Sequence, residues 1–154
     1  MKKGTMRVRI GARDVHYAGN LVSGAHIIGL MTDAGTELAI MVGGTEGLLA
    51  SWRHIEQYVP VALGDYLEIE TWISRYGNTS FDWEAEVHKV CELVDKSGKS
   101  NACKILEPAV LVAKGSFVGV CPKEQNRGFQ VPKEQIPFIP HNGVMWWEKP
   151  KQAK

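Results

Sequence analysis

Hydrophobic and polar positions alternate along most of the chain, and this pattern predicts several β-strands. Residues 6–10 alternate between apolar and charged side chains, which is typical of a strand with one buried face. The same alternation returns over residues 66–73 and 79–94, and a last apolar stretch covers about 105–121. Residues 47–59 have a mixed pattern that also favours a strand. Most of these strands are therefore expected to bury one face.

A helical pattern separates the first strand from the others and runs from Ser23 to about Met41. Ser23 is a plausible N-cap, and Gly43-Gly44 ends the pattern. The apolar residues between them recur at spacings of three and four and form one stripe: Ile27, Met31, Ala34, Leu38 and Met41. One long helix followed by about four long antiparallel strands predicts an α+β fold in which the sheet wraps around the helix.

The length of 154 residues is that of a single domain with a proper core. We assign residues 1–121 to this domain and residues 122–154 to an irregular basic tail, because the tail holds five of the seven prolines and six Lys/Arg against three Asp/Glu. The two strands within 66–94 are long enough for an extended edge pairing between subunits. We therefore expect a homodimer or a multiple of one.

Composition and charge exclude several classes of protein. An apolar fraction of 44% and a charged fraction of 23% are ordinary for a soluble globular protein, and a net charge of +1 disfavours nucleic acid as a partner. The three cysteines are odd in number and have no CxxC spacing, which argues against a disulfide framework and against a zinc site, and we expect no metal ligands. No signal-peptide core and no run of roughly 18 apolar residues is present, so we expect a cytoplasmic protein with no membrane partner.

The predicted helix carries a ribbon of ionisable residues on an otherwise apolar sequence. His26, Asp33 and Glu37 fall, with Leu30, within roughly 60° of one another around the helix axis. The ribbon is either the solvent-facing side or a functional pair of carboxylates. The absence of Lys, Arg and Gln from the helix favours the functional pair. Two carboxylates one turn apart would push their pKa values apart if partly desolvated, and one could then act as a base.

The start of the helix and the loop before it hold further candidates. Gly24 and Ala25 present free backbone N–H groups at the positive end of the helix dipole, where they can polarise a carbonyl or simply be capped. His16 and Tyr17 can supply acid–base chemistry or hydrogen bonds, although a lone histidine is more often structural. Cys121 is interpreted as a buried structural cysteine in preference to a nucleophile.

One pair of segments and the spacing of one pair of residues resemble the hotdog-fold superfamily. Residues 60–68 (PVALGDYLE) and 75–80 (RYGNTS) are similar to its strand–turn–strand signature. The separation of thirteen residues between Asn20 and Asp33 is also found in some hotdog acyl-CoA thioesterases. The resemblance implies a long central helix wrapped by an antiparallel sheet.

A more specific resemblance runs from about residue 7 to residue 128. Residues 14–25 (DVHYAGNLVSGA) and 33–38 (DAGTEL), with a weaker match at 122–128 (PKEQNRG), resemble the β-aminoacyl-CoA ammonia-lyases. Membership would imply reversible elimination of ammonia from a β-aminoacyl-CoA, giving the enoyl-CoA. Such a reaction needs no metal and no redox cofactor, since coenzyme A is part of the substrate.

The resemblance also implies roles for individual residues. Asp33 and Glu37 would be catalytic: one, with Glu37 favoured, removes the α-proton, and the other holds the β-ammonium group. His16 joins them as a catalytic candidate. The substrate-binding candidates are Tyr17, Asn20, Gly24, Ala25, His26 (where the family often carries arginine), Lys123 and Arg127.

Three alternatives stay open on the sequence. An acyl-CoA thioesterase of the same fold would use Asp33 to activate water and would need only one helix acid. A non-catalytic acyl-CoA-binding hotdog protein would need neither Asp33 nor Glu37. A hydratase would share the enoyl product but add water in place of ammonia.

Overall fold

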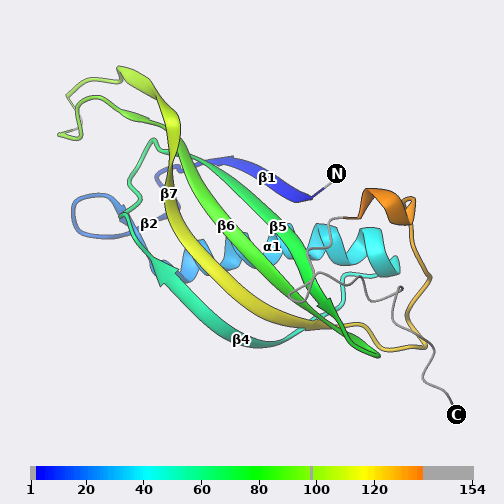
Figure 1. Cartoon of the computed structure of the whole chain (residues 1–154). Coiled ribbons are helices and arrows are strands. Elements are labelled where there is room, and N and C mark those ends of the chain that lie inside the picture. Colours follow the sequence, from blue (N-terminus) through cyan, green and yellow to red (C-terminus); the bar gives the residue numbers. More distant parts are fainter. Residues whose placement is uncertain (1–2, 98, 137–154) are drawn as a thin grey trace, which may run out of the picture.

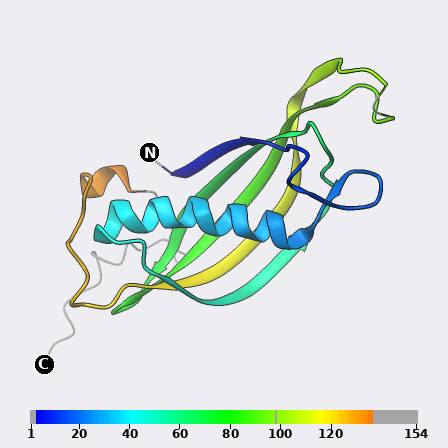
Figure 2. The same cartoon turned by 180° about the vertical axis from the view of Figure 1, so that it is seen from behind.

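The protein, represented by a computed structural model that describes residues 3–97 and 99–136, folds as a curved antiparallel sheet around one long helix (Figure 1). The five strands lie in the order β1-β5-β6-β7-β4. Their bounds, in sheet order, are Gly4–Arg9, Tyr66–Tyr76, Ser80–Leu93, Cys103–Val120 and Leu48–Gln57. Helix α1 (Gly24–Gly43) crosses the inner face of this sheet (Figure 2). The predicted α+β hotdog architecture is confirmed.

Both ends of α1 are closed by the residues that the sequence indicates. The Ser23 hydroxyl accepts a hydrogen bond from the His26 backbone N–H at 3.2 Å, which makes Ser23 the N-cap. Gly44 is the C-cap with φ of 64°, a left-handed conformation that favours glycine, and its N–H donates to the carbonyl of Ile40. The helix therefore begins and ends within a residue or two of its predicted limits.

The apolar stripe of α1 packs on the inner face of the sheet. Ile27, Met31, Ala34 and Leu38 are all buried. They meet the inward-facing side chains of β5 and β6, whose alternation the sequence also predicts: Leu67, Ile69, Thr71, Ile73, Phe81, Trp83, Ala85 and Val87. By length and composition alone, α1 is apolar enough to cross a membrane. Its burial against the sheet gives it the place of a core helix.

The strands expected to pair across subunits are interior strands, so that prediction is wrong. β5 is covered by β1, from Gly4 opposite Thr71 to Arg9 opposite Tyr66. β6 pairs with β5 on one side and with β7 on the other. The edges of the sheet are instead β1 and β4. The pattern of each strand reports which of its faces is buried, but not which strands become its neighbours.

Two segments extend beyond the sheet. The end of β6 and the start of β7 continue past β5 as a two-stranded projection, which we call the arm (residues 92–97 and 99–104; Figure 1). The first part of the predicted tail returns to the C-terminal end of α1, where the backbone N–H of Arg127 donates to Gly43 and that of Gln130 to Met41 (Figure 2). This part contains one short 3₁₀ turn, Lys133–Gln135, followed by the buried Ile136. The rest of the predicted tail lies outside the described residues.

Candidate active site

The loop before α1, residues 11–23, carries the first group of predicted site residues. It contains a small hairpin of β2 (Val15–Tyr17) and β3 (Leu21–Val22). His16 and Tyr17 lie exposed on β2, and their rings meet edge to face with centroids 5.1 Å apart. Asn20 has φ of 59°, the left-handed conformation that asparagine tolerates better than most residues. We call this segment the Asn20 loop.

The Asn20 loop is fastened to the turn at residues 60–65. The Leu63 backbone N–H donates to the carbonyl of Asn20 at 2.9 Å, and the Val22 N–H donates to the carbonyl of Val61 at 2.9 Å. A β-bridge between Leu21 and Ala62 lies between these two hydrogen bonds. The position of Asn20 is therefore set by a turn that lies about forty residues later in the chain.

His26, in the first turn of α1, faces an acid that the sequence reasoning did not single out. Its Nε2 lies 3.7 Å from Asp14 Oδ1. The other oxygen of Asp14 accepts the backbone N–H of Gly11 at 2.7 Å, which closes a tight turn at the start of the Asn20 loop. Gly and Asp are both frequent turn residues, so the sequence did contain a turn signal at residues 11–14. Asp14 thus connects the helix start to the Asn20 loop.

The two carboxylates of the ribbon are both exposed within one subunit. Glu37 is oriented by the edge strand β1, because its Oε2 accepts the backbone N–H of Thr5 at 2.7 Å. Asp33 makes no hydrogen bond or ion pair with any residue in the described part of the chain. Leu30, the fourth position of the ribbon, is buried. Any desolvation of these carboxylates must therefore come from a substrate or from another subunit.

One subunit does not bring all the predicted site residues together. Asp33 comes nine positions after Gly24, so it lies about 13 Å further along the helix axis. His16, Tyr17, Asn20 and the free N–H groups of Gly24 and Ala25 gather at the start of α1, whereas Asp33 and Glu37 lie near its middle. The outward side of the helix between them is open: a Cβ built on Gly29 would meet nothing within 4 Å.

Lys123 and Arg127 lie at the other end of α1. Both side chains are exposed, and the backbone of Arg127 is bonded to Gly43, the last residue of the helix. A helix of 20 residues spans about 30 Å, so these cations are far from the Asn20 loop of their own subunit.

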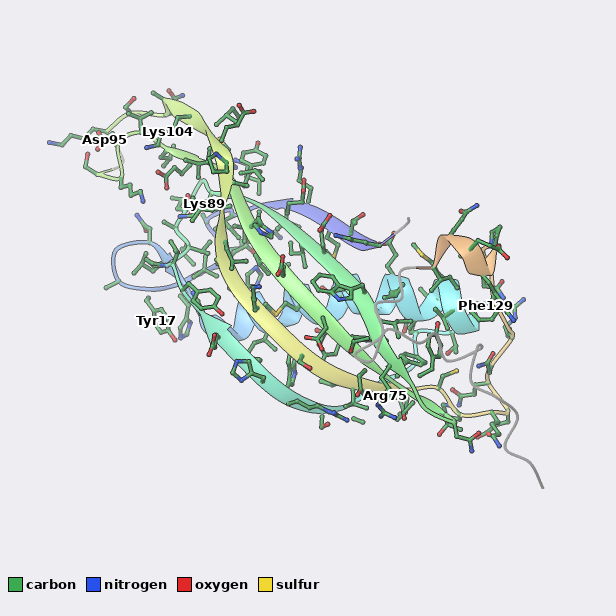
Figure 3. The ribbon with its side chains drawn as sticks, in the orientation of Figure 1. Tyr17, Arg75, Lys89, Asp95, Lys104 and Phe129 are labelled. Atoms are coloured by element: carbon green, nitrogen blue, oxygen red, sulfur yellow. The ribbon has the colours of Figure 1, made fainter. Side chains whose placement is uncertain are left out.

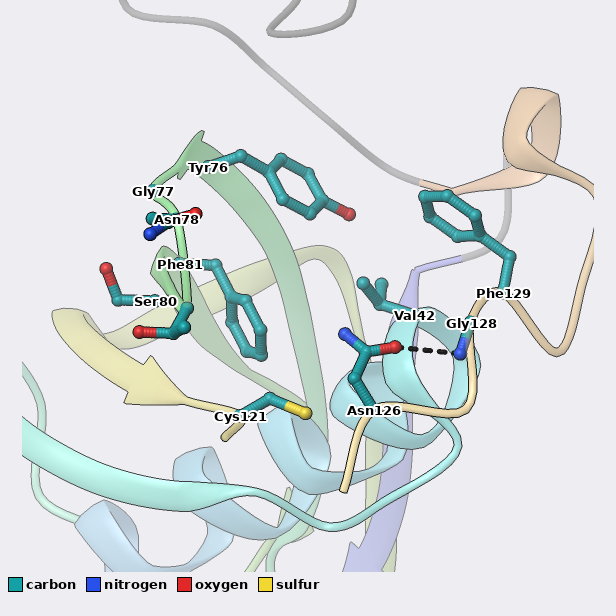
Figure 4. A pocket seen from close by; sticks show the side chains of 11 residues that line it. Val42, Tyr76, Gly77, Asn78, Ser80, Phe81, Cys121, Asn126, Gly128 and Phe129 are labelled. Carbon is teal, nitrogen blue, oxygen red and sulfur yellow. Dashed lines mark hydrogen bonds between the residues drawn. The ribbon is translucent and has the colours of Figure 1, made fainter. Parts of the chain in front are cut away.

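A cavity of about 180 Å³ lies beside these cations, between the turn that joins β5 to β6 and the tail (Figure 4). Tyr76, Phe81 and Phe129 line it with their rings, and Asn126 closes one side by accepting the Gly128 N–H at 2.7 Å. Burial raises the pKa of the Tyr76 hydroxyl and of the Cys121 thiol. Cys121 is buried, as predicted. Within the described ranges, no group of three or more His, Cys, Asp or Glu side chains is arranged to hold a metal ion.

Comparison with known proteins adds to this geometry. The family model of the thioesterase superfamily matches residues 19–92. The 3-aminobutyryl-CoA ammonia lyase of Acetoanaerobium sticklandii is 39% identical over 126 residues, which cover 81% of this chain and 98% of that protein.

Two solved structures are also similar. The β-alanyl-CoA:ammonia lyase from Clostridium propionicum has a TM-score of 0.84 and 33% identity, covering 89% of this chain and 97% of that one. A hexameric thioesterase from Yersinia pestis has a TM-score of 0.62 and 16% identity, covering 82% of this chain and 93% of that one. At that identity the second likeness concerns the fold alone.

Proposed function

Because the chain belongs to the β-aminoacyl-CoA ammonia-lyase family of hotdog-fold proteins, we propose that it catalyses the reversible elimination of ammonia from a β-aminoacyl-CoA, giving the enoyl-CoA. Two relatives that it covers almost completely are named for this reaction. The observation that carries the proposal is the pair Asp33 and Glu37 on a helix without Lys or Arg. A positively charged β-ammonium group needs an anionic partner that an ordinary acyl chain does not need.

The start of α1 activates the substrate. The thioester carbonyl accepts hydrogen bonds from the free N–H groups of Gly24 and Ala25, at the positive end of the helix dipole. These donors stabilise the negative charge that develops on the carbonyl oxygen when the α-proton leaves. The α-hydrogen thereby becomes acidic enough for a carboxylate to remove.

The two carboxylates have different roles: one removes the α-proton and the other binds the β-ammonium group. Glu37, oriented by the Thr5 N–H through Oε2, takes the α-proton on its other oxygen as the general base. Asp33 holds the β-ammonium group by charge-assisted hydrogen bonds. The electron pair of the broken C–H bond forms the double bond, and the C–N bond breaks with its electrons on nitrogen. A substrate that carries an ammonium group therefore releases neutral ammonia.

The distance along α1 between the Asn20 loop and the Asp33–Glu37 pair indicates a site that is shared between subunits. The Asn20 loop of one subunit, with His16 and Tyr17, faces the Asp33–Glu37 ribbon of another, which places substrate-binding and catalytic groups within reach of one acyl group. Lys123 and Arg127 at the far end of the helix, and His26 at its start, are then available for the phosphates of coenzyme A. The long outward side of α1 leaves room for such a partner.

We assign the subunit contact to the β4 edge of the sheet. β4 is a free edge of ten residues, and Leu48 and Leu49 are 65% and 48% exposed on it. A long edge strand with exposed apolar side chains invites pairing with another chain. The assembly is a homodimer or an oligomer built from dimers. The protein acts in the cytoplasm, and the reaction requires no metal and no redox cofactor.

The test is a single reaction mixture assayed for two products. The purified protein is given 3-aminobutyryl-CoA or β-alanyl-CoA, and both ammonia and free thiol are measured. A lyase keeps the thioester and releases ammonia without thiol. Release of thiol without ammonia would establish the thioesterase alternative, and release of neither would favour the non-catalytic acyl-CoA-binding alternative. Ammonia release from one substrate at a higher rate than from the other measures the room beside the β-carbon.

A further inference from the structure

A buried ion pair lies directly beneath the turn that fastens the Asn20 loop. Lys89, on β6, and Asp65, just before β5, have side chains that are 2% and 1% exposed, and Lys89 Nζ lies 2.8 Å from Asp65 Oδ2. Figure 3 shows Lys89 near the base of the arm. The same ammonium group donates to the carbonyl of Pro60 at 3.2 Å. One side chain thus joins both ends of the 60–65 turn.

The ion pair also fixes the interior of this turn. Asp65 Oδ2 accepts the backbone N–H of Ala62 at 2.9 Å, in addition to the ammonium group. The backbone of the turn bonds to two other segments. The Gly64 N–H donates to the carbonyl of Ile10, and the Ile10 N–H donates to the carbonyl of Asp65. On the Asn20 loop, the Val61 carbonyl and the Leu63 N–H bind the backbone of Val22 and Asn20. The turn is therefore held by the ion pair and by Ile10, and it holds the Asn20 loop.

Stability alone does not account for a charged pair at this place. Removing two charges from water is costly, and well-packed apolar residues often stabilise a core as much as a buried ion pair does. Contacts between apolar side chains do not fix the geometry of the groups around them. The hydrogen bonds of an ammonium and a carboxylate group do, because they set the distance and angle between their partners. Here those partners are both ends of the turn that places Asn20.

A cavity of about 170 Å³ lies between the Asn20 loop and the 60–65 turn, so its shape depends on the position of the turn. It is lined by Asn20 and Leu21 from the Asn20 loop, by Pro60 and Ala62 from the turn, and by Lys96 from the arm. A shift of the turn would change the width of this cavity and the direction of the Asn20 side chain together.

We propose that Asp65 and Lys89 are positioning residues for the elimination reaction: their buried ion pair holds the 60–65 turn, and through it Asn20, in the geometry that binds the acyl-CoA substrate. The inference rests on the proposed function, in which Asn20 binds substrate. Neither residue touches the reacting atoms, and both act through the two backbone hydrogen bonds to the Asn20 loop.

The first experiment replaces Lys89→Met, which keeps most of the length of the side chain and removes its charge. We expect kcat/KM for ammonia release from 3-aminobutyryl-CoA to fall about 10- to 100-fold, the scale of a small misplacement of a substrate contact. Hydrogen exchange at the Val22 and Leu63 amides should become faster. Lys114→Met is the matched control, because Lys114, on the neighbouring strand β7, is exposed and pairs with Glu86, whereas Lys89 pairs with Asp65 and Glu92. It should leave the rate and both amides unchanged.

Two further variants separate positioning from general stability. Asp65→Asn combined with Lys89→Met leaves no uncompensated buried charge, so it keeps the test usable if Lys89→Met alone does not fold. Asn20→Gly removes the side chain without straining its left-handed backbone. If Lys89 acts through Asn20, adding Lys89→Met to Asn20→Gly costs no further activity, whereas a general effect on the fold multiplies the two losses.

The outcomes decide the proposal whether or not the proposed function holds. Multiplied losses, or normal rates and unchanged amide exchange in the Asp65→Asn/Lys89→Met variant, would overturn it. Loss of activity without faster exchange at Val22 and Leu63 would overturn it as well. If the unmodified chain releases no ammonia, the proposed function fails, and the exchange of these two amides alone decides whether the ion pair holds the Asn20 loop.

Discussion

Replacing each carboxylate of the helix ribbon by its amide should remove activity while leaving the fold intact. Asp33→Asn and Glu37→Gln are close to isosteric, so neither creates a cavity. Loss of a general acid–base group typically lowers turnover by about 100-fold or more. A factor of 100 corresponds to about 2.7 kcal/mol of lost transition-state stabilisation.

The cost to stability should be far smaller and should differ between the two positions. Glu37 accepts one exposed hydrogen bond from the Thr5 N–H, and a glutamine carbonyl can still accept it. Only the charge assistance is lost, about 0.5 kcal/mol at an exposed site. At about 2–4 °C per kcal/mol for a chain of this size, Glu37→Gln lowers the melting temperature by about 1–2 °C. Asp33→Asn should not lower it, because Asp33 has no partner in the described part of the chain.

The assay compares initial rates of ammonia release with thermal melting for both variants and for Glu46→Gln. Glu46 is an exposed acid just after the helix, so its replacement should change neither quantity. A base lost from position 37 lowers kcat with little change in KM, whereas loss of the ammonium partner at position 33 also raises KM. Near-normal rates in both variants, accompanied by lower melting temperatures, would show that the ribbon is structural and refute the assignment.

Other consequences of the structure can be measured independently. Gly35→Ala should lower the melting temperature, because its Cβ would lie 2.6 Å from the Trp83 ring, and overpacking of about 1–3 kcal/mol outweighs the gain in helix propensity. Iodoacetamide should label the exposed Cys103 in the folded protein but reach Cys91 and Cys121 only on unfolding, since both are buried and burial raises the pKa of their thiols; labelling of all three at one rate would contradict the packing. Sedimentation at micromolar concentration should show a dimer or larger species, and a stable folded monomer would refute the shared site.

The sequence predicts the elements of this fold well because their signals are local. The stripe through Met31 and Leu38 has a helical period, so its residues share one face only in a helix. The alternation from Leu67 to Ile73 has a period of two, so its apolar residues share one face only in a strand. Caps are equally local, which is why Ser23 could be assigned. Strand order has no such signal, because β1 and β4 become edges only through pairings between distant segments.

Charged residues inside the fold show where a local pattern is incomplete. The alternation through Val87 continues to Lys89 and places it on the inner face, so its burial had a signal in the sequence, but its partner Asp65 did not. Asp82 falls on the outer face by the same alternation and is nevertheless buried. Its carboxylate is covered by Arg75 on the neighbouring strand and by Arg53 reaching from β4 across β7.

The candidate site, too, was predicted only in part from the sequence. The sequence alone identified the candidate residues of the ribbon and of the Asn20 loop, and it also showed their resemblance to the family. Their separation along α1 follows from the rise of the helix, and joining them requires a second chain, which no pattern within one sequence contains. The donor that orients Glu37 is equally invisible, because it belongs to the backbone of a strand that lies 32 positions earlier.

The use of the Thr5 backbone N–H to orient Glu37 has an evolutionary consequence. Every amino acid except proline carries a backbone N–H, so the anchor of Glu37 is retained whatever side chain occupies position 5. The side chain at position 5 can therefore vary among descendants of this protein, and homologues need not share a residue there to orient the same carboxylate. A proline at that position is the single replacement that removes the donor, and lineages that retain the chemistry should avoid it.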